Sequence, residues 1–494
     1  MKPIKNKIIF ADARDNQSRE FLLRSRYWPC LMIIFYLIAC NKLVEIPPPS
    51  TTITTSQVFA DSIDAAAAIS GIYSRIQYDG NGLAFCNGIE TVICGLSSDE
   101  LVSFYTDSYL NFYANTLNPS EGNLYFFFWQ QPYQCIYQAN TCIEGLQTAS
   151  SIPQPVKNQF TGEAKFFRSL FYFYLVNLFG DIPYVSSSNW RQTDTMGRTN
   201  SSVIYQKIID DLKDAQSLLG EDYSFSNGQR TRINRHAAAA LLARVYLFIG
   251  DWRNAEMQAS SVINNTQFSL ESDLNSVFLA NNRESILQWE LNTSYGFYNS
   301  TAVGYNILPP DVSLPPGYYA SAQLLSSFEN GDNRRIHWFN ENTYEGTTYT
   351  YPYKYKVGQH EQVPNGSASE YFTVLRLAEQ YLIRAEARAQ QGNVAEAAAD
   401  LNIIRNRAGL SNTGATTQAE LMSAILHERQ VELFAEWGHR WLDLKRTGKV
   451  NDVMSIATPL KNTGTTWQPY QQLYPIPSSQ LAINPFLRQN AGYQ

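Results

Sequence analysis

Two short stretches, "ARVYLFIGDWRNAEMQA" (Ala243–Ala259) and "AEARAQQGNVAEAAAD" (Ala385–Asp400), share one pattern. In each, a helical repeat of apolar residues ends at a glycine, Gly250 or Gly392, and an alanine follows after four intervening residues. The glycine permits a left-handed turn, and the small alanine lets two helices approach closely. Each stretch is therefore predicted to be a pair of antiparallel helices.

This pattern resembles the tetratricopeptide helix pair, whose stacked copies form a superhelix with a concave face. The region between the two pairs, residues 268–370, is rich in Asn, Gly, Pro and Tyr, which is typical of short strands and loops. The predicted fold is mainly α, a tetratricopeptide-like helical scaffold with a loop- and short-strand-rich central insertion. Loops on a rigid scaffold are where binding residues usually lie. Apolar residues at helical spacing predict further helices over residues 61–76, 126–146, 157–180 and 201–219.

The N-terminus has the pattern of an export signal. Basic residues precede an apolar run from Trp28 to Ala39, and Leu37-Ile38-Ala39-Cys40 resembles a bacterial lipobox. The run is shorter than the roughly 20 residues that a membrane-spanning helix needs. We expect residues 1–39 to be a lipoprotein signal peptide and Cys40 to carry the lipid anchor.

Composition excludes some functions. The formal net charge is -6 and the chain has no basic block, so nucleic acid is not an expected partner. The histidines are scattered and C-x-x-C is absent, so no zinc site is expected. No cofactor is predicted; calcium stays an open alternative through Asp99, Glu100 and Asp107. The other cysteines that follow Cys40 are expected to be buried free thiols: Cys86, Cys94, Cys135 and Cys142.

Several longer stretches resemble the SusD/RagB family of Bacteroidetes. They include "GEAKFFRSLFYFYLVNLFGDIPYV" (Gly162–Val185), "VLRLAEQYLIRAEARAQQGN" (Val374–Asn393) with "LNIIRNRAGL" (Leu401–Leu410), "HERQVELFAEWGHRWLDLKRTGK" (His427–Lys449) and "LYPIPSSQLAINPFLRQNAGY" (Leu473–Tyr493). "CNKLVEIPPP", "FADSIDAAAAISGIY" and "GLSSDE" fit the same family near the N-terminus. The match runs in order along nearly all of the chain that follows Cys40.

The resemblance implies a lipid-anchored outer-membrane protein, facing the exterior, that captures a nutrient and passes it to a SusC-like TonB-dependent transporter. In the family the nutrient is most often an oligosaccharide and sometimes a peptide. The implied organisation is a signal peptide (1–39), an N-terminal SusD-like helical region (40–267) and a C-terminal RagB/SusD region (268–494) that includes the insertion 268–370. A peptide ligand, a surface glycosidase and a purely structural tetratricopeptide scaffold stay as alternatives.

Two acidic groups are candidates for catalysis. Glu379 and Glu386 lie seven positions apart, about 10 Å along one helix face, but ion pairing with Arg405 and Arg407 is the favoured interpretation. A second row has Glu-x-x-His spacing at its end, yet a di-metal site needs another such motif. That row is Glu428, Glu432, Glu436 and His439, with Arg429, Arg440 and Lys445 as the expected ion partners. We therefore expect a protein that is not an enzyme.

Binding a sugar calls for flat aromatic faces beside polar groups. Two Tyr-rich stretches meet this description, Leu101–Asn115 and Glu290–Asn306. The predicted ligand-binding residues are Tyr105, Tyr109, Tyr295 and Tyr298. Tyr105 and Tyr109 fit equally well as a core stripe of one helix. A third group is assigned to structural packing along an edge strand: Tyr349, Tyr351, Tyr353 and Tyr355.

Overall fold

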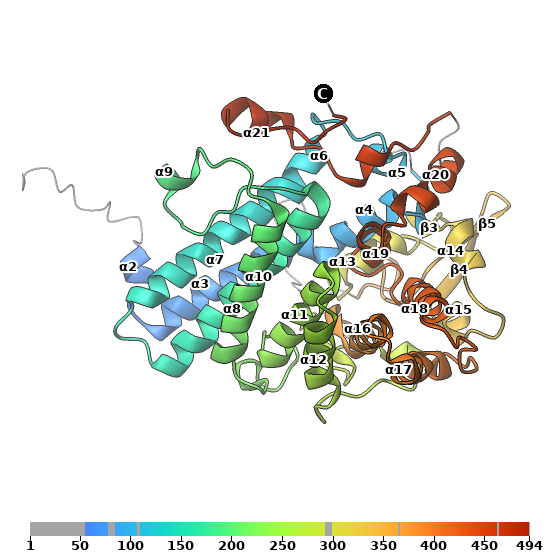
Figure 1. Ribbon diagram of the computed structural model, residues 1–494, viewed down its shortest axis with the longest axis horizontal. Helices are drawn as coiled ribbons and strands as arrows, with labels where there is room; N and C mark the ends of the chain where they lie inside the picture. Colours follow the sequence, from blue (N-terminus) through green and yellow to red (C-terminus); the bar gives the residue numbers. More distant parts are fainter. Residues whose placement is uncertain are drawn as a thin grey trace, which may run out of the picture. The chain divides into compact units, whose positions relative to one another are not determined.

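Long helices stack side by side in chain order (Figure 1). The computed structural model describes residues 55–77, 84–105, 109–291, 299–363, 366–461 and 464–493, and Thr55–Gln494 form one compact unit. Each helix of the stack packs against the next: α3 (Ser62–Gln77), α7 (Gln131–Thr148), α8 (Gln154–Phe179), α10 (Ser201–Leu218), α11 (Arg235–Ile249), α12 (Trp252–Ile263), α16 (Leu377–Gln390), α17 (Val394–Arg407) and α18 (Gln418–Glu432). Packing between successive helices is the architecture of a repeat scaffold, so the predicted mainly-α, tetratricopeptide-like fold is confirmed.

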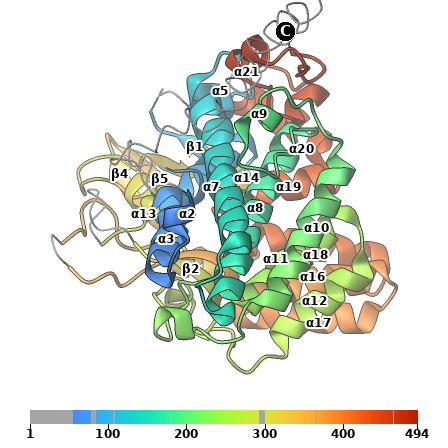
Figure 2. The ribbon, with the colours of Figure 1, turned by 90° about the vertical axis from the view of Figure 1, so that its left-hand side faces the viewer.

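The two helix pairs that share the Gly and Ala pattern lie directly against each other. Helix α12 packs on α16, although residues 264–376 separate them in the sequence, and Figures 1 and 2 both place them side by side. Gly250 and Gly392 adopt φ angles of 75° and 83°, in the left-handed region predicted for the turn. Ala255 and Ala397 are fully buried at the helix contacts.

The remaining elements are short. The helices are α2 (Thr55–Val58), α4 (Glu90–Ser97), α5 (Leu110–Tyr113), α6 (Gly122–Tyr125), α9 (Trp190–Thr193), α13 (Ala302–Ile307), α14 (Ala322–Ser326), α15 (Asn333–His337), α19 (His439–Arg446), α20 (Val450–Lys461) and α21 (Ser478–Ile483). Two π turns, η2 (Phe85–Ile89) and η3 (Phe126–Gln130), precede α4 and α7. The described strands form two-stranded antiparallel sheets: β1 (Leu101–Ser103) with β3 (Tyr318–Ala320), β2 (Ser285–Trp289) with β6 (Phe372–Arg376), and β4 (Phe339–Tyr344) with β5 (Thr347–Pro352).

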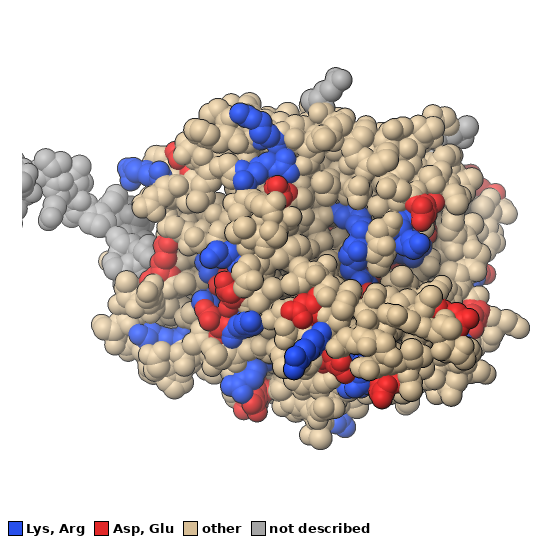
Figure 3. Space-filling view, viewed as in Figure 1, with Lys and Arg blue, Asp and Glu red and all other residues tan. Residues whose placement is uncertain are grey.

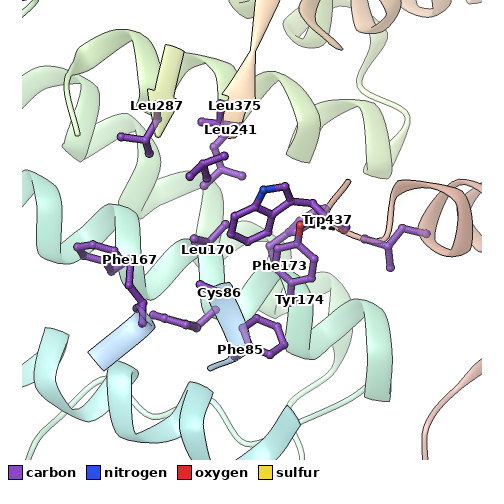
Figure 4. Close-up of a cluster of buried hydrophobic side chains, with 14 of the residues drawn as sticks. Phe85, Cys86, Phe167, Leu170, Phe173, Tyr174, Leu241, Leu287, Leu375 and Trp437 are labelled. Atoms are coloured by element: carbon purple, nitrogen blue, oxygen red, sulfur yellow. Dashed lines mark hydrogen bonds between the residues drawn. The ribbon is translucent and has the colours of Figure 1, made fainter. Parts of the chain in front are cut away.

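Helix α8 runs through the main hydrophobic core. Phe167, Leu170, Phe173 and Tyr174 of this helix lie among side chains from η2, α11, β2, β6 and the loop before α19 (Figure 4). The Tyr174 hydroxyl donates a hydrogen bond to the carbonyl oxygen of Trp437 over 3.2 Å. Because helices from the first half and strands from the second half share this core, the scaffold and the insertion hold each other in place.

A cluster of buried charges lies where α18, β6 and the insertion meet. Its members are Arg334, Lys354, Arg376, Arg407, Glu284, Glu428, Glu432 and Glu436, all buried or nearly so. The predicted ion pairing of the acidic row is thus confirmed, but its expected partners are wrong. Helix α18 ends at Glu432, so the end of the row faces β6 and the insertion. The expected partners bind elsewhere: Arg429 to Asp443, Arg440 to Asp99, and Lys445 to the carbonyl of Asn177.

The four predicted free cysteines, Cys86, Cys94, Cys135 and Cys142, are all buried and unbonded to one another, which confirms that prediction. Cys40 lies outside the described residues. Among the helices that the structure describes, none combines the length and the apolar character required to cross a membrane.

Candidate functional site

Strand pairing brings the N-terminal stretch after Glu100 against the central insertion. Val102 of β1 lies opposite Tyr319 of β3, and the backbone N–H of Phe104 donates to the Gly317 carbonyl over 3.0 Å. Ser321 extends the junction, because its N–H donates to the Glu100 carbonyl over 2.8 Å. Segments more than two hundred positions apart in the sequence are therefore joined at one place on the surface.

The β4–β5 hairpin supplies the second part of this surface. Its two-residue turn, Glu345-Gly346, has φ angles of 47° and 78°, as a tight hairpin turn requires. Tyr344 and Tyr349 lie on the same face of the hairpin, since Tyr344 pairs with Thr347 and side chains alternate along a strand. Figure 1 shows β3, β4 and β5 grouped together.

Five aromatic rings meet here, and we call them the aromatic platform: Phe104, Tyr105, Tyr319, Tyr344 and Tyr349. Phe104 is their hub, with ring centroids 5.2 Å from Tyr105, 5.8 Å from Tyr344 and 5.4 Å from Tyr349, each in edge-to-face contact. Tyr319 contacts Tyr349 over 5.1 Å. Edge-to-face packing fixes the orientation of each ring, so the platform is preformed.

The platform is accessible and uncharged. Tyr105 is 46% exposed, and the other four rings are partly exposed. Burial and the neighbouring Tyr349 raise the pKa of Tyr319 above its ordinary value, so its phenol stays a neutral hydroxyl at physiological pH. Rings with hydroxyl tips offer both stacking faces and hydrogen-bond partners to a polyhydroxylated ligand.

The structure separates the predicted site residues. Tyr105 belongs to the aromatic platform, whereas Tyr109 directly precedes α5 and is half-buried against the core. They are not a stripe of one helix, because Tyr105 follows strand β1 and stands outside α5. Tyr295 and Tyr298 lie outside the described residues.

Four platform residues, Phe104, Tyr319, Tyr344 and Tyr349, are not among the predicted ligand-binding residues, although each has a weak local signal. Phe104 lies beside Tyr105 in the Tyr-rich stretch Leu101–Asn115. Tyr349 was assigned to packing; Tyr351 and Tyr355 of the same group are indeed buried, while Tyr349 lies at the surface end of the strand. Tyr344 flanks a Glu-Gly hairpin turn, and Tyr319 follows a Pro-Pro-Gly loop. Alternation along β5 placed Tyr349 on a defined face, but sequence alone did not indicate which end of the strand meets solvent.

The candidate catalytic carboxylates are buried in ion pairs. Glu379 accepts two hydrogen bonds from Arg244 at 2.7 Å, and Glu386 accepts two from Arg446 at 2.6 and 2.7 Å. Pairing is therefore confirmed, but the predicted partners are wrong. Arg405 and Arg407 extend from the end of α17 toward the insertion, where they bind Glu329 and Glu284.

The acidic pair before β1 has a structural role. The Asp99 carboxylate accepts two hydrogen bonds from Arg440 at 2.7 Å, and Glu100 is buried, which raises its pKa to about 8. Asp107 lies outside the described residues. Within the described ranges, no three His, Cys, Asp or Glu side chains gather as a metal site would require.

The surface charge is mixed. Figure 3 shows basic and acidic side chains interspersed on one face of the molecule, with large uncharged areas between them. A helical-repeat scaffold that presents neutral aromatic rings where the segment after β1 meets the insertion has the architecture of a binding protein.

Comparison with known proteins agrees with this class. A family model described as "SusD family" matches residues 280–493, and one described as "Starch-binding associating with outer membrane" matches residues 90–247. SusD-like protein P2 of Formosa agariphila is 27% identical, with 94% of this chain and 98% of that protein covered. The chain belongs to the SusD/RagB family.

Solved structures share the fold. A SusD superfamily protein from Bacteroides vulgatus has a TM-score of 0.76 at 22% identity, covering 88% of this chain and 99% of that one. Surface glycan-binding protein A from Bacteroides thetaiotaomicron, in complex with laminarihexaose, has a TM-score of 0.72 at 17% identity, covering 87% and 99%.

Proposed function

We propose that this protein is a cell-surface lipoprotein that binds an oligosaccharide on the aromatic platform and delivers it to a SusC-like TonB-dependent transporter. The observation that carries the proposal is the convergence of five neutral rings from three chain segments on one exposed surface. The structural neighbour that holds laminarihexaose and the starch-binding family model both support a carbohydrate ligand.

The chemistry of the platform favours sugar over charged ligands. Pyranose rings have apolar faces that stack on aromatic rings and hydroxyls that exchange hydrogen bonds with phenols. Losing one well-stacked ring costs roughly 1.5–3 kcal/mol, which is about tenfold to a hundredfold in Kd.

Calorimetric titration with panels of neutral glycans and peptides tests the ligand class. Tyr105→Ala and Tyr344→Ala should each weaken glycan binding by about tenfold or more, because each removes a platform ring. Phe225→Ala is a matched control, since Phe225 is 45% exposed and packs on Phe160, away from the platform. Unchanged glycan affinity in both tyrosine variants contradicts the platform assignment, and binding of peptides alone favours the peptide alternative.

Anchoring and delivery need separate tests. Replacing Cys40 with Ala should release the protein from the membrane fraction, because a lipobox cysteine forms the thioether to the lipid. The transporter role predicts that a large outer-membrane barrel co-purifies with the full chain from detergent extracts. Recovery of the protein alone would favour the structural-scaffold alternative.

A further inference from the structure

A groove on a different part of the protein, which we call the α7 groove, lies apart from the aromatic platform. One wall consists of α6, η3 and α7; the other consists of residues 193–196 and helix α21. Its volume is about 830 Å³, within the usual range of about 300–1,000 Å³ for small-ligand sites. In Figure 1, α7, α9 and α21 lie on the side opposite the β4–β5 hairpin, so the groove is separate from the aromatic platform.

An aromatic row follows the first wall at intervals of four residues: Tyr125, Trp129, Tyr133 and Tyr137. Trp129 contacts Tyr133 over 5.2 Å, and Tyr137 is 53% exposed. The row passes through the π turn η3, a distortion that is frequent at functional sites and shifts the register of side chains along a helix. Successive rings are spaced by about 6 Å along the axis, roughly the length of one sugar unit.

A row of amides runs beside the rings. Gln130, Gln134 and Gln138 line the same groove, again at intervals of four. An amide carries both donors and an acceptor, which suits hydroxyl groups, and the Gln134 side-chain carbonyl already accepts one hydrogen bond from Arg75 over 3.3 Å. The described charged residues of the groove are one cation, Arg75, and one anion, Asp194, so their charges cancel.

The walls of the groove are fixed by hydrogen bonds. The Asn484 amide donates to the Met196 carbonyl over 2.9 Å, which ties α21 to the chain after α9. The Tyr133 hydroxyl donates to the Pro183 carbonyl over 2.8 Å, which holds the chain at Pro183, another part of the groove lining, against α7. A preformed site avoids the cost of ordering its loops when a ligand binds.

We propose that the α7 groove is a second carbohydrate site, which holds a neutral oligosaccharide with its rings against Tyr133 and Tyr137 and its hydroxyls on the glutamine row. An extended peptide fits less well, because the backbone groups of the helical wall already bond within the helix and offer no strand edge. This inference rests on the proposed glycan-binding function. A glycan long enough to reach both sites would be retained more firmly than by either site alone.

The test counts binding events in the full chain by calorimetry with neutral hexasaccharides of glucose, galactose, mannose and xylose. The wild type should show two events, and the Tyr105→Ala/Tyr344→Ala variant should keep one. Adding Tyr137→Ala to that variant should weaken the remaining event at least tenfold, while Tyr137→Trp should retain it and Phe225→Ala should leave it unchanged.

Each result separates the two proposals. If the Tyr105→Ala/Tyr344→Ala variant loses all binding, the platform proposal stands and the groove proposal is overturned. If that variant keeps full binding and Tyr137→Ala abolishes it, the groove stands and the platform fails. If the wild type binds none of the hexasaccharides, both the platform proposal and the groove proposal are overturned. If the binding event that remains in the Tyr105→Ala/Tyr344→Ala variant is not weakened by Tyr137→Ala, the groove proposal is overturned.

Discussion

Glu432 is the centre of the buried charge cluster, and neutralising it should destabilise the protein strongly. Its carboxylate accepts hydrogen bonds from Arg376 at 2.6 Å, from Arg334 at 2.9 Å and from Arg407, and its side chain is inaccessible to solvent. In Glu432→Gln the shape is kept, but the amide nitrogen must face at least one guanidinium. Removing one partner of a buried ion pair costs roughly 3–5 kcal/mol.

Urea unfolding followed by circular dichroism measures this loss at pH 7. The matched control is Glu341→Gln, since Glu341 is 56% exposed and lies 3.7 Å from Arg335, where an ion pair contributes about 0–1 kcal/mol. If Glu432→Gln unfolds at the same urea concentration as Glu341→Gln, the cluster does not stabilise the fold as argued.

The pH dependence gives a second check on Glu432. Burial alone raises its pKa, but Arg407, Arg376 and Arg334 outweigh burial and leave the pKa far below its usual range. The Glu432 carboxylate therefore binds a proton more tightly in the unfolded chain, where its pKa is about 4.3, than in the folded protein. The stability difference between wild type and Glu432→Gln should be constant from about pH 6 to 8 and shrink as the pH falls below about 4. A difference that grows on acidification would contradict this assignment.

Four smaller tests each concern a single residue. Gly392→Ala should lower the free energy of unfolding by about 1–2 kcal/mol, because the φ of 83° at Gly392 disfavours a residue with a side chain. Gly71→Ala inside α3 should raise it by about 0.5–1 kcal/mol, because alanine restricts the unfolded chain more than glycine does and its Cβ meets no other atom there. Urea unfolding measures both changes. Burial raises the pKa of Cys94 to about 12, so iodoacetamide at pH 8 should label this thiol only after unfolding, as mass spectrometry can detect. Tyr174→Phe should cost about 0.5–1.5 kcal/mol in thermal unfolding, because the bond to Trp437 is lost.

Local features of the fold could be predicted from sequence because their signals are local. The turns at Gly250 and Gly392 need one residue of permissive backbone, and the burial of α8 follows from apolar residues on most of its sides. Ion-pair partners could not be predicted in the same way. Arg244 and Glu379 are 135 positions apart, so their contact depends on how distant helices stack.

The aromatic platform was only partly predictable for the same reason. Tyr105 stood out in a polar, Tyr-rich stretch, but its neighbours are determined by the pairing of β1 with β3, each three residues long. Strands this short carry almost no periodic signal. The sequence therefore indicated one edge of the site, while tertiary pairing decides which other rings join it.

The acidic pair before β1 connects the scaffold to the platform. Arg440 of α19 holds Asp99 with two hydrogen bonds, and the Ser321 hydroxyl donates to the Asp99 carbonyl over 2.5 Å. Ser321 follows β3 directly, so a residue of the helical scaffold fixes both strands at the base of the platform. A binding surface gains affinity when its supporting residues are locked before the ligand arrives. The Asp-Glu motif therefore positions the strands of the platform from four or more residues before its first ring, Phe104.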